Sequence, residues 1–292
     1  MRILLVGKNS FIGKNYFNYS VYCDINEVDS VGLVPENLDF SHYDVVIHLA
    51  AIVHQSKKIN LSQYLEVNAE LPVRVARKAK NDGVPHFIFL STTKVYGDKI
   101  PPQGYWDEDS ECNPTDSYGI SKLKAEKALL ELADQTFTVS ILRTPMVYGS
   151  GVKANMLALM KWVLKFPILP FKGVSARRSI TFVGNLAGFI DRIIEKKAQG
   201  VFIAQDSAPV TAEEIVKNIA KSANQRIRVV SPGSFLLYFL KKLLPGYYHR
   251  LYAPAVVSNN KTLLLLDFEP PYSTADGIET MVKNFIENAH GR

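Results

Sequence analysis

The sequence predicts an α/β fold: a Rossmann-type doubly wound parallel sheet with a smaller C-terminal substrate-binding lobe. Short apolar runs of β type alternate with helical stretches throughout residues 1–150, which is typical of right-handed βαβ units in a parallel sheet. The first run passes through a glycine-containing turn into a helix, as in dinucleotide-binding sites. Beyond residue 150 the elements shorten and proline is more frequent. We therefore expect a dinucleotide-binding domain at 1–150 and, at 151–292, mainly a second lobe whose chain crosses back to the sheet.

The composition is that of an ordinary globular protein. Hydrophobic residues make up 47% and charged residues 21% of the 292 positions, which is enough chain for a sizeable core. Cys23 and Cys112 form neither a CxxC pair nor a disulfide framework, so we expect a reducing compartment and a cytoplasmic protein without a metal site. Residues 3–6 predict a buried strand rather than a signal peptide. No apolar run reaches the roughly 18 residues that a membrane span needs.

The net charge of +6 is compatible with nucleic acid, anionic lipid or an anionic small substrate. The basic residues are scattered, with no run of five or more and no interleaving with aromatic residues. This pattern argues against a nucleic-acid partner. A ligand that carries a diphosphate fits the charge, and so does simple solubility.

The first strand, predicted over residues 3–6, leads into the turn 7–13 (GKNSFIG). Its first glycine can make the tight turn, its last lets the following helix pack close to the sheet, and the helix N-terminus offers free N–H groups to a pyrophosphate. Ser10 stands where a middle glycine is expected, and it is small enough to leave room. The predicted cofactor-binding residues in this turn are Gly7, Ser10, Phe11, Ile12 and Gly13.

The second strand is predicted over residues 27–33. Its expected tip, 31–33 (VGL), has no carboxylate to bind the adenosine ribose. Asp24 and Asp29 lie nearby, but their register is open. The sequence alone therefore leaves NAD and NADP as alternatives.

The third strand, 44–51 (DVVIHLAA), ends in small residues that would let a ligand approach the backbone. Leu49, Ala50 and Ala51 are predicted to bind the cofactor, and His48 is interpreted as a histidine whose hydrogen bonds are satisfied within the strand. A helix is predicted over about 58–82, ending at the C-cap signal 81–83 (NDG). Within it, Asn68 either braces the neighbouring strand ends or is exposed.

The fourth strand, 86–91, runs into 91–97 (STTKVYG), which places hydroxyl groups where open α/β sheets bind ligands. Residues 98–116 are predicted to form a loop, 117–133 a helix and 136–142 the next strand. In that helix Tyr118 and Lys122 are four residues apart and share a face. A cation beside a phenol lowers the pKa of the phenol, which makes a proton donor and acceptor usable near neutral pH. Taken alone, such a pair is more often part of a solvated helix face.

Five signals occur in order: the 7–13 turn, 48–51 (HLAA), 91–97, the Tyr118/Lys122 pair and 143–149 (RTPMVYG). Together they resemble the extended short-chain dehydrogenase/reductase superfamily of nucleotide-sugar epimerases, dehydratases and reductases, over nearly the whole chain. The resemblance implies an NAD or NADP cofactor, with Tyr118 as the catalytic acid/base. It also implies that Lys122 lowers the pKa of the phenol and holds the nicotinamide ribose. Thr92 matches the catalytic Ser/Thr that hydrogen-bonds the substrate oxygen.

The resemblance also implies a UDP-sugar substrate, with 151–292 mainly a nucleotide-sugar-binding lobe. Asn155 matches a side chain that contacts the nucleotide diphosphate, and Arg178 an arginine that reaches the same group, although an exposed surface arginine is its alternative interpretation. An arginine fork suits phosphate oxygens better than a lysine does. Thr92 and Thr93 complete the predicted substrate-binding residues.

Dehydratases of the superfamily carry an Asp-Glu pair directly after the catalytic Thr, where this chain has Thr93 and Lys94, so 4,6-dehydration is not expected. Residues 143–183 and the C-terminal half look most like bacterial reductases that make UDP-linked 6-deoxy-N-acetylhexosamines for capsule or O-antigen. We favour NAD(P)H-dependent reduction of a 4-keto sugar. The alternatives are a 4-epimerase with tightly held NAD and a binding protein without catalysis.

Residues 235–252 combine large apolar side chains with basic ones. This composition fits an interfacial helix on an anionic membrane. It also fits a cover over the lobe's core or a dimer contact, and the superfamily resemblance implies a homodimer formed through a four-helix contact.

Overall fold

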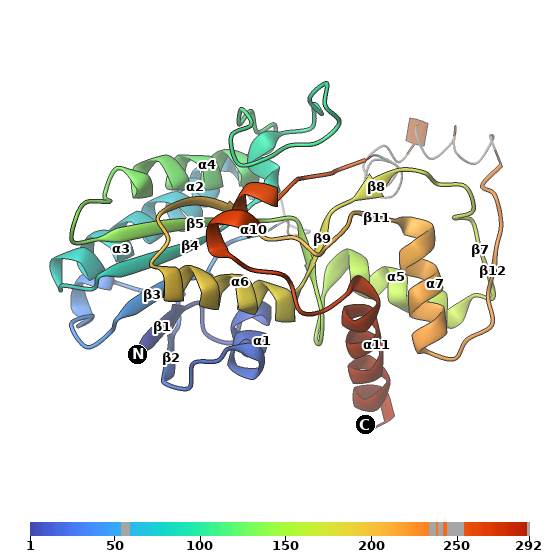
Figure 1. Cartoon of the computed structure of the whole chain (residues 1–292), viewed down its shortest axis with the longest axis horizontal. Helices are drawn as coiled ribbons and strands as arrows, with labels where there is room; N and C mark the ends of the chain where they lie inside the picture. Colours follow the sequence, from blue (N-terminus) through green and yellow to red (C-terminus); the bar gives the residue numbers. More distant parts are fainter. Residues whose placement is uncertain (54–58, 234–237, 239–241, 244–253, 291–292) are drawn as a thin grey trace. The chain divides into compact units, whose positions relative to one another are not determined.

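The structure is a computed structural model that describes residues 1–53, 59–233, 238, 242–243 and 254–290 (Figure 1). The chain divides into two compact units. The first, called here the sheet unit, comprises Met1–Pro145, Gly184–Ala204 and Val257–Glu269; the second unit comprises Met146–Val183, Gln205–Val256 and Pro270–Arg292. The chain therefore returns to the sheet unit twice after residue 145.

A parallel sheet of six strands, in the order β10-β5-β4-β3-β1-β2, forms the centre of the sheet unit as the structure describes it (Figure 1). Four of its strands, β1, β3, β4 and nearly all of β5, are buried, as expected for parallel strands covered on both faces. This confirms the predicted doubly wound fold. The strands are β1 (Ile3–Val6), β2 (Ile25–Val28), β3 (Val45–His48), β4 (His86–Thr92), β5 (Thr138–Thr144) and β10 (Gly200–Ile203).

The chain turns from one side of β1 to the other between β2 and β3, because both strands pair with β1. Open α/β sheets bind ligands at such a switch point, outside the carboxyl ends of the strands. The 7–13 turn follows β1 and residues 49–51 follow β3 at this edge. The fold thus places both predicted cofactor segments at the same crevice.

Helices cover both faces of this sheet (Figure 1). One face carries α3 and α4, and the other carries α1 and α6, which are joined by a hydrogen bond from the Tyr16 hydroxyl to Asp191 of 2.6 Å. The helices of the sheet unit are α1 (Phe11–Tyr19), α2 (Leu61–Leu65), α3 (Leu71–Asn81), α4 (Ser117–Leu130), α6 (Val183–Lys196) and α10 (Asn260–Leu266). A π-helical turn, Glu66–Glu70, joins α2 to α3, and 3₁₀ turns occupy Pro35–Asn37 and Thr93–Tyr96.

The second strand ends earlier than the predicted 27–33. It covers Ile25–Val28 and is followed at once by a turn, in which the Asp29 carboxylate accepts a hydrogen bond of 2.9 Å from the Val31 N–H. Gly32 has a positive φ of 68°. This local turn competes successfully with the extended conformation that the apolar residues 31–33 suggested.

In the second unit the described residues form α5 (Ala154–Lys165), α7 (Ala212–Ser222) and α11 (Thr274–His290) with three short strand pairs. A buried carboxylate, Asp206, holds part of it together by accepting hydrogen bonds from the Tyr148 hydroxyl (2.7 Å) and the Phe182 N–H (2.8 Å). The pairs are β6 (Met146–Tyr148) with β9 (Ile180–Phe182), β7 (Ile168–Leu169) with β12 (Arg228–Val229), and β8 (Arg177–Arg178) with β11 (Val210–Thr211).

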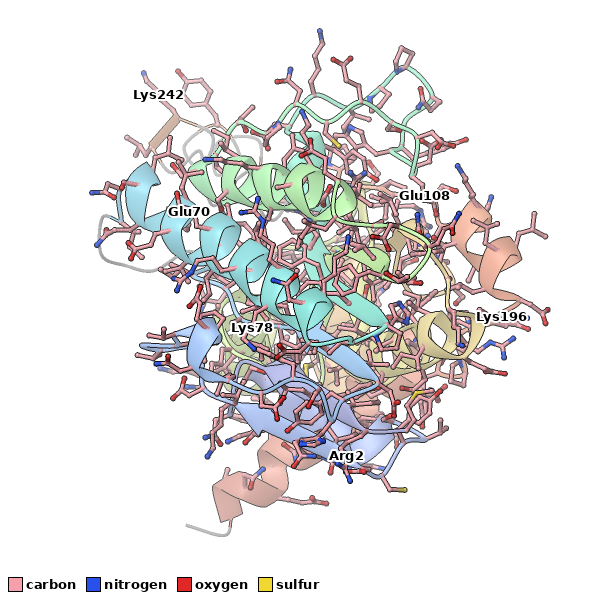
Figure 2. All side chains as sticks on the ribbon, turned by 90° about the vertical axis from the view of Figure 1, so that its left-hand side faces the viewer. Arg2, Glu70, Lys78, Glu108, Lys196 and Lys242 are labelled. Carbon is pink, nitrogen blue, oxygen red and sulfur yellow. The ribbon has the colours of Figure 1, made fainter. Side chains whose placement is uncertain are left out.

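The loop 98–116 is hydrogen-bonded to α10 within the sheet unit. Glu108 lies beside α10 (Figure 2) and accepts a hydrogen bond of 3.0 Å from the Thr262 N–H. No helix among the described residues is long and apolar enough to span a membrane. Most of the predicted interfacial segment 235–252 lies outside the residues that the structure describes.

Candidate active site

Tyr118 lies in the first turn of α4, next to the end of β4. Asp116 caps this helix, since its carboxylate accepts a hydrogen bond of 2.7 Å from the Gly119 N–H. Thr92 is the last residue of β4, and its hydroxyl accepts a bond of 3.2 Å from the Lys94 N–H, which starts the 3₁₀ turn. The Thr92 side chain lies close enough to the Tyr118 phenol to lower its pKa through hydrogen bonding. The structure thus places two hydroxyl groups together at the ligand-binding edge of the sheet.

Burial raises the pKa of Tyr118 to about 12, and the hydrogen bond with Thr92 acts in the opposite direction. The expected lowering of the phenol's pKa by Lys122 is therefore not seen in the structure. The ammonium group of Lys122 instead donates a hydrogen bond of 2.7 Å to the Leu90 carbonyl oxygen. A phenol with a raised pKa stays protonated at neutral pH, so it is a proton donor before it can be an acceptor.

Lys122 is buried, with 1% of its surface exposed, and its ammonium lies 4.1 Å from the centroid of the Phe89 ring. Desolvation lowers its pKa to about 7, while the Glu126 carboxylate acts to raise it. This side chain is consequently poised between its charged and neutral forms near neutral pH. A strongly perturbed pKa at the ligand-binding edge of a parallel sheet is typical of functional lysines.

A buried ionic network lies next to this pair, and the sequence analysis missed it. Arg143 at the end of β5 donates to Glu126 of α4, with an Nη2–Oε2 distance of 2.7 Å, and to the Tyr96 hydroxyl at 3.0 Å. Ser91 of β4 donates to the same Glu126 carboxylate. The signal in the sequence was the spacing, because Glu126 is four residues beyond Lys122 on the same helix face.

Asn68 of the π-helical turn braces the neighbouring elements, which decides between its two predicted roles. It is fully buried; its amide donates to the Ile52 carbonyl (3.0 Å) and the Ser121 hydroxyl (3.1 Å), and its oxygen accepts from the Ile52 N–H (2.8 Å). The Ser121 hydroxyl donates in turn to the Tyr118 carbonyl (2.8 Å). These bonds connect the segment after β3 to the first turn of α4.

The edge of the sheet at β1 and β3 has the backbone features of a dinucleotide-binding turn. Gly7 has a positive φ of 127°, and a Cβ there would lie 3.1 Å from the Ala50 nitrogen, so only glycine suits this close approach. Ser10 is the N-cap of α1, because its hydroxyl accepts a bond of 3.0 Å from the Gly13 N–H, which explains a serine at this point of the turn. The N–H groups of Phe11 and Ile12 open the helix, where a pyrophosphate binds favourably.

The observed end of β2 places a carboxylate where a dinucleotide fold binds the adenosine ribose. With Val28 as its last residue, Asp29 follows the strand directly and is exposed. A carboxylate at this point of a dinucleotide fold hydrogen-bonds the adenosine ribose of NAD. The predicted tip at 31–33, which lacks a carboxylate, was therefore wrong.

His48 does not have the satisfied hydrogen bonds that were expected. It is fully buried at the end of β3, and neither ring nitrogen has a hydrogen-bond partner within the described parts of the chain. Its ring lies beside those of Phe87 and Phe89 on the neighbouring strand, at centroid distances of 6.4 and 6.0 Å. Burial lowers its pKa to about 3, with a further contribution from Lys122, so the ring is neutral.

The predicted diphosphate-binding residues belong to the second unit. Asn155 is exposed in the first turn of α5, and Arg178 lies half-buried in β8. Burial lowers the pKa of Arg178. Thr93 belongs to the sheet unit, where it begins the 3₁₀ turn after Thr92. The roles of these three residues toward a substrate remain predictions.

Comparison with known proteins gives the family. Residues 13–203 match the NAD dependent epimerase/dehydratase family. The chain is 30% identical to the UDP-glucose 4-epimerase of Vibrio cholerae, over 96% of this chain and 89% of that protein. It is 27% identical to the N-acetyl-alpha-D-glucosaminyl-diphospho-ditrans,octacis-undecaprenol 4-epimerase of Escherichia coli O157:H7, over 84% and 78%. With the dTDP-4-dehydro-6-deoxyglucose reductase of Escherichia coli it shares 22% identity, over 92% and 83%.

Solved structures show the same fold. The UDP-glucuronic acid 4-epimerase of Bacillus cereus in complex with NAD has a TM-score of 0.76 at 20% identity, with 99% of both chains covered. The dTDP-4-dehydrorhamnose reductase of Bacillus anthracis in complex with NADP also has a TM-score of 0.76, at 21% identity, with 98% of this chain and 99% of that chain covered. The chain belongs to the NAD dependent epimerase/dehydratase family, whose UDP-sugar epimerases and sugar-nucleotide reductases depend on NAD or NADP.

Proposed function

We propose that this protein is an NAD-dependent 4-epimerase of a UDP-hexose. The observation that carries the proposal is the position of Thr92, the last residue of β4, beside Tyr118 in the first turn of α4, at the ligand-binding edge of the sheet. The similarity to a UDP-glucose 4-epimerase along 96% of the chain supports it, and so does Asp29 at the end of β2, which suits NAD. The sequence alone favoured a reductase, and these observations shift the preference.

In this proposal the Thr92 hydroxyl orients the oxygen on C4 of the sugar, and Tyr118 exchanges the proton on that oxygen. NAD, held by the 7–13 turn, residues 49–51 and Asp29, would supply the exchange of hydride with C4. The Tyr118 phenol must lose its proton for the oxidising half-reaction. A lower pKa in the loaded enzyme is therefore part of the proposal.

Asn155 and Arg178 would hold the diphosphate of the substrate. The guanidinium of Arg178 can form two parallel hydrogen bonds to phosphate oxygens. A sugar diphosphate on a polyprenol, as named for the Escherichia coli O157:H7 relative, offers the same group to these residues. Uridine is the carrier that we propose, because the Vibrio cholerae relative is similar over more of the chain.

The second candidate is a nucleotide-sugar 4-ketoreductase, and one observation favours it. A Tyr118 phenol with a pKa of about 12 is already protonated. It can therefore donate a proton to the oxygen of a ketone while the ketone is reduced. The similarity to a dTDP-4-dehydro-6-deoxyglucose reductase along 92% of the chain agrees with this alternative.

One experiment separates the candidates. Purified protein is incubated with UDP-glucose without added cofactor, and UDP-galactose is measured by chromatography; in parallel, UDP-4-keto-6-deoxy-N-acetylglucosamine is offered with NADH or NADPH. We expect interconversion in the first assay. Oxidation of NADH or NADPH in the second assay, without interconversion in the first, would establish the reductase instead.

The Tyr118→Phe variant tests the role of the phenol in either reaction. Removing the proton donor is expected to lower kcat by about 10²–10⁴-fold, the usual contribution of general acid–base catalysis. A variant with Tyr105, an exposed tyrosine of the 98–116 loop, changed to Phe serves as the control and is expected to keep full turnover. Full turnover of Tyr118→Phe would refute the assignment.

A further inference from the structure

An exposed patch on the second unit combines large apolar side chains with unpaired cations. Trp162 of α5, Phe166 at its C-cap and Ile168 of β7 are 51%, 45% and 58% exposed. These three residues, with Lys165 and Arg228, are called here the α5-end patch. Since β7 and β12 pair side by side, with Ile168 opposite Arg228, the strand residues are direct neighbours (Figure 1).

The local sequence explains why these side chains point outward. Helix α5 buries Met156, Met160 and Val163, which occupy one face at spacings of four and three residues. Trp162 and Lys165 are three residues apart on the opposite face. The chain then leaves the helix, and Arg228 of β12 binds back through its N–H to the Pro167 carbonyl oxygen at 2.7 Å. The patch is therefore fixed by backbone hydrogen bonds.

Within the described part of the chain, the cations of this region have no anionic partners. Lys165 and Arg228, and their exposed neighbours Lys161 and Arg226, form no ion pair among the described residues. The sequence explains this, because residues 135–190 and 215–266 contain no Asp or Glu. These cations are therefore available to an anionic partner.

The charge of the chain is divided unevenly between its units. The second unit has 15 Lys and Arg against 6 Asp and Glu, a formal charge of +9. The sheet unit has 19 against 22, a formal charge of −3. The net charge of +6 is thus the sum of a strongly basic unit and a weakly acidic one, and an anionic surface attracts a strongly basic unit.

We propose that the α5-end patch docks this protein on a bilayer surface that contains anionic phospholipid. Tryptophan prefers the boundary between headgroups and acyl chains, where its ring is apolar and its N–H stays hydrated. Phe166 and Ile168 bury their side chains at the same depth, and the four cations bind the phosphate headgroups. The inference does not depend on which sugar reaction the protein catalyses.

The same observations disfavour a second copy of this chain as the occupant. A two-fold interface would bring Lys165 and Arg228 of one copy against the same residues of its partner. No carboxylate of residues 135–190 or 215–266 could compensate them. An anionic bilayer meets both the apolar and the basic side chains of the patch.

The chain offers its own optical probe. It has two tryptophans, of which Trp106 is buried and Trp162 belongs to the patch. Protein is mixed with vesicles of phosphatidylglycerol and phosphatidylcholine, or of phosphatidylcholine alone, and emission and sedimentation are recorded. We expect a blue shift and co-sedimentation with the anionic vesicles only, both reduced by high salt. The Trp162→Phe variant should still sediment with the vesicles but lose the shift.

A charge-matched pair of double variants tests the surface. Lys161→Glu/Lys165→Glu reverses two cations beside the tryptophan and is expected to weaken binding to anionic vesicles at least tenfold. Lys217→Glu/Lys283→Glu makes the same change of charge on exposed parts of α7 and α11, and should weaken binding less than threefold. Thermal midpoints of both proteins show whether they remain folded.

Three results would overturn the proposal. These are equal or absent binding to the two kinds of vesicle, an equal loss of binding in both double variants, and an unshifted Trp162 emission in protein that has sedimented with vesicles. A dimer in sedimentation velocity that only the patch variants dissociate, with no vesicle binding, would assign the patch to a second copy instead.

Discussion

At the scale of single residues, the ion pair of Glu126 and Arg143 is the interaction on which the end of β5 and the middle of α4 depend. Their side chains are 2% and 7% exposed. Changing Glu126 to Gln leaves the guanidinium buried without a counter-charge, and breaking a buried pair in this way costs about 3–5 kcal/mol. Urea unfolding of Glu126→Gln should show a loss of this size.

The control is Glu279→Gln in the exposed pair with Lys283, which should stay within about 0.5 kcal/mol of the wild type because surface pairs contribute little. A loss below about 1 kcal/mol for Glu126→Gln would mean that the network is not structural.

Two buried histidines make stability depend on pH. Burial lowers the pKa of His48 to about 3 and that of His86 to about 4, while both take up a proton near pH 6.5 in the unfolded chain. Between these values the unfolded state binds more protons, so stability falls as the pH falls from 6.5 toward 4. Each histidine contributes a slope of about 1.4 kcal/mol per pH unit.

Urea unfolding at pH 7.5, 6 and 5 measures this slope, and the range avoids most carboxylate titration. The His48→Leu variant keeps an apolar side chain beside Phe87 and Phe89. The slope of its unfolding free energy against pH should be smaller by the contribution of one histidine. An unchanged slope in this variant would show that His48 titrates normally in the folded state.

The sequence predicted Tyr118 and Lys122 as a pair because helical spacing puts them on one face, and it predicted the family through motifs in order. It could not predict the direction of the pKa of Tyr118. That depends on burial against residues far away in the chain and on Lys122 donating to Leu90. The unsatisfied ring of His48 depends likewise on the packing of β4 beside β3.

At the scale of elements, the first turn of α4 is positioned by close packing at Gly119. A Cβ there would lie 2.7 Å from the Lys94 carbonyl oxygen and 2.9 Å from the Pro114 Cβ. Gly119→Ala should therefore push the turn away from Thr92, and a displacement near 1 Å can lower turnover by about 10²-fold. Activity assays and thermal melting of the variant measure both effects.

Ile120→Ala is the matched control, since that side chain is exposed one residue further on in the helix. It should keep turnover within about threefold. If Gly119→Ala also kept it, the position of Tyr118 would not depend on this contact.

Element boundaries were predicted well where one signal dominated. Apolar runs gave β1 and β4 closely, whereas the predicted strand 44–51 extends three residues beyond the end of β3 at His48. The helix over about 58–82 was found, although it consists of α2, a π-helical turn and α3. The π-helical turn was not foreseeable, because the hydrogen bonds of Asn68 to Ile52 and Ser121 lie outside its local sequence. The end of β2 was misjudged because the Asp29 side chain forms a turn.

At the scale of the whole molecule, the choice of cofactor should appear as a difference in stability. Ligand at 100 times its Kd stabilises the native state by about 2.7 kcal/mol. The Asp29 carboxylate can bind the ribose hydroxyls of NAD but repels the additional phosphate of NADP. NAD should therefore raise the thermal midpoint more than NADP at equal concentration.

Asp29→Asn removes the repulsion between the carboxylate and the additional phosphate of NADP. The thermal midpoints with NAD and with NADP should therefore differ less in this variant. Asp39→Asn, which changes an exposed carboxylate of a neighbouring loop, is the control. A larger shift with NADP than with NAD in the wild type would contradict the assignment of Asp29.

The division of the chain has a consequence for its synthesis. Until residues 200–203 leave the ribosome, β5 is an edge strand that pairs only with β4, because its outer partner is β10. β10 also lacks one hydrogen bond until Thr262 has been made, because the Thr262 hydroxyl accepts a hydrogen bond of 2.8 Å from the Ile203 N–H. The sheet unit thus begins with β1 and is completed only by residues 257–269. A nascent chain stopped before residue 257 should remain a target for chaperones, although it already contains Thr92, Tyr118 and Lys122.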